Sequence, residues 1–69
     1  MLKFSTRLRE LRKDKNMTQK QLADVFKVHY TTVKDWENRG KQPSYETLME
    51  LAKFFDVTTD YLLGIADLL

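Results

Sequence analysis

The apolar residues between Thr18 and Glu37 predict two short helices that pack against each other over a tight three-residue connection. Small Ala23 lies where the helices are expected to cross, and the other inward positions are Leu22, Phe26, Val28, Val33 and Trp36. Such a helix-turn-helix leaves the polar face of its second helix free to enter the major groove of DNA. The pattern therefore favours a sequence-specific DNA-binding module.

Three more helices are expected around this pair. The first covers about residues 4–15, where apolar side chains recur at steps of 4 and 3 residues. Another follows Ser44, which has the chemistry of a helix N-cap, and a short last helix runs from Thr58 to Gly64. The apolar stripes of the two longer helices are Phe4, Leu8 and Leu11, and then Leu48, Leu51, Ala52 and Phe55.

The helix-turn-helix itself carries end signals. Thr18 and Gln21 have the spacing of a capping box, and the second helix of the pair is expected from His29 or Tyr30 to Asn38. His29 is then a surface or capping residue. No β-strand pattern competes, so the sequence predicts an all-α, compact five-helix bundle. We expect one domain over residues 1–69, with the helix-turn-helix at about 18–38 and a tail or dimer contact at 65–69.

Composition removes several classes of function. A chain of 69 residues without cysteine and with one histidine has no material for a metal cluster, a disulfide or a catalytic cleft, so we expect no enzyme activity, no metal and no cofactor. No small-molecule ligand is evident. No apolar run has the length of a membrane span or a signal segment, which predicts a cytoplasmic protein with no membrane partner.

Charge is distributed unevenly along the chain. Residues 1–15 hold six basic and two acidic side chains, residues 16–41 hold five and three, and residues 42–69 hold one and five. The net charges of the three segments are therefore +4, +2 and −4. A fold that gathers the basic part on one face would attract phosphate there. Charged helix surfaces in general produce similar compositions, so the asymmetry favours nucleic acid without identifying it.

The sequence resembles the Cro/phage-repressor-like (XRE) helix-turn-helix family over nearly its whole length. The segments that carry the resemblance are RLRELRKDKNMTQKQLA, TTVKDWEN, QPSYETLMELAKFFDV and TTDYLLG. The resemblance implies a lambda-repressor-like DNA-binding domain, bacterial or phage-encoded. Such a domain is expected to bind operator-like double-stranded DNA as a two-fold homodimer and to regulate transcription, as a repressor in particular.

This chain departs from the family where glycine often ends a helix in the left-handed conformation. Asn16, Lys27 and Asp56 occupy those positions. Asn and Asp tolerate the left-handed region, whereas a lysine there costs roughly 1 kcal/mol. Lys27 is therefore the unusual residue of the turn. The glycine after the third helix is also displaced, because Asn38 and Arg39 precede Gly40.

Base reading is assigned to the first turns of the third helix, where such helices contact base edges. Four side chains share its outward face: Tyr30, Thr31, Lys34 and Asp35. Lys34 would donate to guanine and Asp35 would accept from cytosine, although the Asp35 charge opposes DNA unless a cytosine or Lys34 compensates it. The alternative is that these residues are simply solvated.

Phosphate contacts are assigned to both sides of the groove. Thr18 and Gln19 present the N-terminus of the second helix to one phosphate. The resemblance implies that Gln19 either holds the DNA backbone or buttresses the reading helix. Thr32 faces a phosphate or solvent, and the opposite side is held by Asn38, Arg39, Lys41 and Gln42. The resemblance implies that Arg12 and Glu37 form a partly buried structural ion pair instead of contacting DNA.

Other conspicuous side chains are assigned to packing. The aromatic residues are expected in the core or at its edge, not as base-stacking groups: Phe26, Trp36, Tyr45, Phe54 and Phe55. The C-terminal segment holds more apolar side chains than a short helix buries alone, so a dimer contact is expected through Leu62, Leu63, Ile65 and Leu68. The same residues keep open an alternative function, a protein-interaction module such as an antitoxin-like or adaptor protein.

Overall fold

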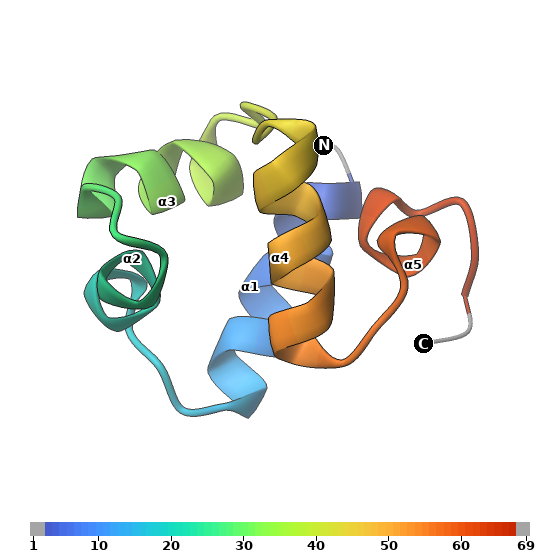
Figure 1. Cartoon of the computed structure of the whole chain (residues 1–69), viewed down its shortest axis with the longest axis horizontal. Helices are drawn as coiled ribbons and strands as arrows, with labels where there is room; N and C mark the ends of the chain where they lie inside the picture. Colours follow the sequence, from blue (N-terminus) through green and yellow to red (C-terminus); the bar gives the residue numbers. More distant parts are fainter. Residues whose placement is uncertain (1–2, 68–69) are drawn as a thin grey trace.

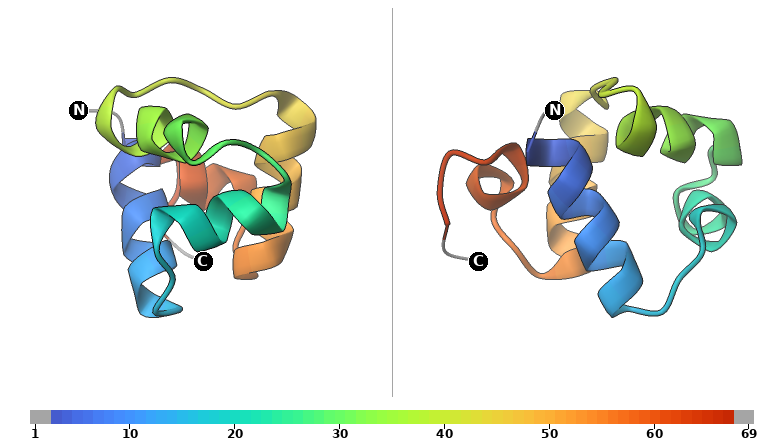
Figure 2. Two further views of the ribbon diagram at one scale, coloured as in Figure 1. Left: turned by 90° about the vertical axis from the view of Figure 1, so that its left-hand side faces the viewer. Right: turned by 180° about the vertical axis from the view of Figure 1, so that it is seen from behind.

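The computed structural model describes residues 3–67, which form five α-helices and no β-strand (Figure 1). They are α1 (Lys3–Asp14), α2 (Gln19–Phe26), α3 (Tyr30–Asn38), α4 (Tyr45–Phe55) and α5 (Thr59–Leu63). The all-α five-helix prediction is confirmed. The pair α2 and α3 lies at one end of the molecule and α5 at the other, with α1 and α4 between them (Figure 2).

Side chains at the helix N-termini explain where the helices begin. Thr18 and Gln21 form the predicted capping box, in which the Thr18 hydroxyl accepts from Gln21 N at 3.0 Å and Gln21 Oε1 accepts from Thr18 N at 2.8 Å. Ser44 and Thr58 cap α4 and α5 with their hydroxyls, which accept from Thr47 N and Tyr61 N. His29 caps α3, because its ring nitrogen accepts from Thr31 N.

The ends of the helices confirm the predicted left-handed positions. Asn16, Lys27 and Asp56 have φ of 57°, 56° and 56°. Lys27 and Asp56 close α2 and α4, and their backbone N–H groups bond to carbonyls of the preceding turn. In this conformation the chain turns back sharply, so α2 passes into α3 within three residues.

A single core fills the space between the helices. Its buried apolar residues are Phe4, Leu8, Leu22, Ala23, Val33, Trp36, Leu51, Ala52, Phe55 and Leu62. Phe26 and Phe54 lie at the edge of this core and meet edge to face, with ring centroids 5.7 Å apart. The prediction for Tyr45 was wrong: as the first residue of α4 it lies outside the apolar stripe, and 85% of it is exposed.

Arg7 on α1 holds the C-terminal part of the described chain. Its guanidinium donates to Tyr61 O and Ala66 O, both at 2.6 Å, and to Asp67 Oδ1 at 2.9 Å. It also lies over the Tyr61 ring at 4.1 Å from the centroid. These contacts fix α5 and the residues after it against α1. Over residues 3–67, the structure has no helix with the length and apolar character needed to cross a membrane.

Candidate nucleic-acid interface

Helix α3 has one buried face and one polar face. Val33, Trp36 and Glu37 are buried against the other helices. Three of the predicted reading residues, Tyr30, Thr31 and Lys34, are exposed together on the opposite side, and Tyr30 is 47% exposed. The polar face of α3 is therefore on the surface, and α3 lies with α2 at one end of the molecule (Figure 2).

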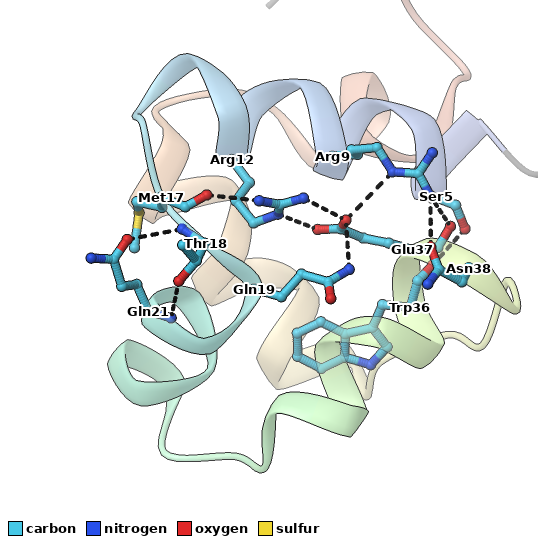
Figure 3. Close-up of polar contacts among 10 residues, drawn as sticks. All are labelled: Ser5, Arg9, Arg12, Met17, Thr18, Gln19, Gln21, Trp36, Glu37 and Asn38. Carbon is cyan, nitrogen blue, oxygen red and sulfur yellow. Dashed lines mark hydrogen bonds and ion pairs between the residues drawn. The ribbon is translucent and has the colours of Figure 1, made fainter.

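Glu37 fixes α3 to the rest of the fold. Its side chain is completely buried, and its carboxylate accepts two hydrogen bonds from Arg12, Nε to Oε2 at 2.7 Å and Nη2 to Oε1 at 3.0 Å (Figure 3). The predicted ion pair is thus present, and its burial is deeper than the partial burial implied by the resemblance. Arg12 Nη1 also donates to Met17 O at 2.7 Å, which ties the chain before α2 to the same network.

Gln19 joins this network from α2. Its side-chain nitrogen donates to Glu37 Oε1 at 3.2 Å, so the predicted buttress of the reading helix is observed. Among the residues that the structure describes, no buried side-chain nitrogen or oxygen lacks a hydrogen-bond partner. The backbone N–H of Gln19 is a separate donor, which helix geometry leaves without an intrahelical acceptor.

The base-reading candidates differ in their surroundings. The Thr31 hydroxyl lies 2.9 Å from His29 Nδ1, and the His29 ring packs against Tyr30 with centroids 5.0 Å apart. His29 therefore orients the first turn of α3 in addition to capping it. Lys34 is exposed, whereas Thr32 is only half-buried and donates its backbone N–H to His29 O.

Asp35 lies apart from the other reading candidates. Its side chain is 28% exposed, and its carboxylate oxygens lie 3.6 Å from Arg39 Nε and 4.0 Å from Lys41 Nζ. Its backbone carbonyl accepts from the N–H groups of both residues. The cations that approach Asp35 are thus those of the loop after α3, not Lys34, and Asp35 shapes the loop that carries them.

The phosphate candidates after α3 are all on the surface. Asn38, Arg39, Lys41 and Gln42 are exposed, and Gly40 has φ of 68°, so the loop turns at the glycine. Arg9 of α1, which the sequence reasoning missed, contacts this region by donating to Asn38 Oδ1 at 2.7 Å. The spacing of Ser5, Arg9 and Arg12 on one face of α1 was the available signal.

The predicted dimer residues are not equivalent. Leu62 is completely buried in the core, so its assignment as a dimer contact was wrong: α5 needs this leucine to pack against its own domain. Leu63 and Ile65 are 42% and 73% exposed. Leu68 lies outside the described residues.

The geometry is that of a helix-turn-helix protein, and residues 8–62 match the helix-turn-helix family, to which the chain belongs. It is 40% identical over 68 residues to the HTH-type transcriptional activator BcrR of Enterococcus faecalis, covering 99% of this chain and 33% of that protein. The CTXphi transcriptional repressor RstR of Vibrio cholerae is 33% identical over 63 residues, covering 91% and 56%. The chain spans between 33% and 57% of the curated relatives it matches.

A solved structure shares the fold. The P22 c2 repressor, in a crystal structure with a synthetic operator, superposes with a TM-score of 0.79 at 30% sequence identity, covering 87% of this chain and 91% of that one.

Proposed function

We propose that this chain binds double-stranded DNA sequence-specifically by placing α3 in the major groove, and that it regulates transcription. The observation that carries the proposal is the division of α3 into a face fixed by Glu37 and an exposed face with Tyr30, Thr31 and Lys34. The relatives named as transcriptional regulators and the P22 c2 repressor in complex with a synthetic operator support it. No catalytic step is part of the proposal, and the protein would act in the cytoplasm of a bacterium or of a phage-infected cell.

Two sets of groups would hold the DNA backbone. The N-terminus of α2 at Thr18 and Gln19 offers backbone N–H groups and the positive end of the helix dipole to one phosphate. The loop after α3, with Arg39, Lys41 and Gln42, would hold the other side of the groove. Thr32 is the remaining phosphate candidate beside α3.

A second copy of the chain is the proposed protein partner. Leu63 and Ile65 are exposed apolar side chains at the α5 end of the molecule. A two-fold dimer through this end would present two α3 helices to half-sites about 34 Å apart. Leu63→Lys and Ile65→Lys should abolish cooperative binding to two half-sites, and light scattering should then show one copy of the chain on the DNA instead of two. Calorimetry should show an unchanged melting temperature.

Regulation is proposed to be repression, because it requires only that the domain occupies its DNA site. The related activator and repressor show that both signs occur among similar proteins. A reporter gene placed behind the selected site decides the sign: expression falls on induction of a repressor and rises with an activator.

The test of DNA reading is in vitro selection from random duplexes, read by sequencing. A two-fold-symmetric consensus is expected, and Lys34→Ala should relax the preference at one base pair by about 1–3 kcal/mol. Lys41→Ala should instead weaken binding to all sequences and reduce the slope of log K against log salt by about 0.9. Lys53→Ala, in the last turn of α4, is the matched control.

If the selection enriches no DNA sequence, the proposal that α3 reads bases is wrong. An interaction that persists unchanged as salt rises would favour the protein-interaction alternative, because an apolar protein contact releases no counterions.

A further inference from the structure

The side-chain amide of Asn38 has a defined orientation at the end of α3. Arg9 Nη2 lies 2.7 Å from Asn38 Oδ1. A guanidinium has only N–H donors, so the amide atom facing it must be the oxygen. The two donors on Asn38 Nδ2 consequently face away from Arg9. Because Asn38 is exposed, these donors are available on the same surface as the loop after α3.

Arg9 is itself held in place. The same Nη2 donates to the Glu37 backbone carbonyl at 3.0 Å, and Arg9 Nε lies 3.5 Å from Glu37 Oε1 (Figure 3). Its side chain is only 33% exposed. Turning Arg9 toward solvent would break its contacts with a completely buried carboxylate and with the last turn of α3. Arg9 is therefore poorly placed to bind DNA directly, although it is a cation beside the proposed interface.

We propose that Arg9 is a positioning residue for DNA binding: it holds Asn38 so that Nδ2 donates to a backbone phosphate. This inference rests on the proposed function and adds a residue of α1 to it. The contact is made by a neutral amide, so it displaces no counterion. It fixes the orientation of the protein on the DNA and adds no charge to the interface. Arg9 contributes through Asn38, not through a phosphate of its own.

Asn38→Asp gives the sharpest test. The carboxylate keeps an acceptor for Arg9, so the melting temperature should stay the same or rise. It also places a negative oxygen where Nδ2 stood. Binding to a mixed-sequence duplex of about two helical turns should fall about 3- to 10-fold for Asn38→Ala, through loss of one hydrogen bond. It should fall a further 5-fold or so for Asn38→Asp, through repulsion by the phosphate.

A double-mutant cycle tests the role of Arg9. Arg9→Met should weaken binding of the wild-type chain about as much as Asn38→Ala does, and should have no further effect in the Asn38→Ala chain. Arg9→Lys should restore part of the affinity, because an ammonium can still donate to Asn38 Oδ1. The salt slope should stay the same in all these variants. Unfolding curves recorded alongside separate a loss of contact from a loss of fold.

Several results would overturn the inference. If Arg9→Met weakens the Asn38→Ala chain as strongly as the wild type, Arg9 acts independently of Asn38. A salt slope lower by about 0.9 would show that Arg9 contacts a phosphate itself. Equal affinities of wild type, Asn38→Ala and Asn38→Asp would remove Asn38 from the interface while leaving the proposed function intact. A wild-type chain that binds no duplex at all would instead overturn the proposed function and this inference together.

Discussion

Replacing Lys27 by glycine should stabilise the domain. Lys27 ends α2 with φ of 56° and ψ of 39°, the left-handed conformation, and its backbone N–H bonds to carbonyls of the preceding turn. A side chain in this conformation brings Cβ close to the following carbonyl oxygen, at a cost of about 1–2 kcal/mol. Glycine has no Cβ, so it adopts the same backbone without this contact and keeps both hydrogen bonds.

The gain is reduced by the greater freedom of glycine in the unfolded chain. That term destabilises by about 0.4–1 kcal/mol. The net stabilisation, taken from the midpoints of the two ranges, is then roughly 0.8 kcal/mol. In a domain of this size 1 kcal/mol shifts the melting temperature by about 4–8 °C, so Lys27→Gly should raise it by about 3–6 °C.

Thermal unfolding followed by circular dichroism measures this shift, with Lys27→Ala as the matched control. Alanine removes the lysine side chain beyond Cβ but keeps the strained backbone, so any lost side-chain contact affects both variants alike. A glycine variant that melts no higher than the alanine variant would refute the strain argument. DNA affinity should be measured for both variants. If Lys27 binds a phosphate, replacing it should reduce the slope of log K against log salt by about 0.9.

Three further substitutions test other parts of the structure. Glu37→Ala should destabilise by about 3–5 kcal/mol because it leaves the guanidinium of α1 buried and unpaired; DNA binding lost with native melting retained would contradict this. Gly64→Ala should lower the melting temperature, because φ is 84° and an added Cβ would lie 2.6 Å from Lys3 Cβ; an unchanged melting temperature would contradict both the backbone strain and the close contact. Asp35→Asn should tighten binding to every duplex without changing the selected consensus, since it frees the loop cations, and a lost preference for cytosine would show that Asp35 reads a base.

Local signals explain what could be predicted from the sequence. Helix ends depend on a few neighbouring residues, so the capping box at Thr18 and the left-handed positions at Asn16 and Asp56 were predictable. The burial of aromatic and leucine residues was harder to predict near helix ends and in short helices, where few apolar positions define the buried face. Tyr45 is the first residue of α4 and lies outside its apolar stripe. Leu62 belongs to a short helix, α5, and is buried because α5 packs on α1 and α4.

The sequence predicted which residues of the candidate site are exposed, but not which side chains they contact. The exposed face with Tyr30 and Lys34 follows from helical periodicity once Val33 and Trp36 face inward. The partners of polar side chains depend in addition on how α1 is rotated against α3. The spacing of Ser5, Arg9 and Arg12 indicates that they share a face of α1, but not which groups that face meets. The contact from Arg9 to the end of α3 appeared only in three dimensions for this reason.

The groups that hold α3 in place are separate from the residues proposed to read bases. Glu37 accepts hydrogen bonds from Arg12 of α1 and Gln19 of α2 on the buried side of α3. These bonds hold α3 by its buried face and near its C-terminal end. Within residues 3–67, the side chains of Tyr30, Thr31 and Lys34 make no hydrogen bond or ion pair with those helices. The side-chain partner of Tyr30 and Thr31 is His29, the cap of the same helix. Substitutions on the exposed face therefore cost little stability, typically within about 0.5 kcal/mol, whereas substitutions at Glu37 change the fold itself. Helices of this kind can acquire new DNA preferences at their first turns without losing the geometry that presents them.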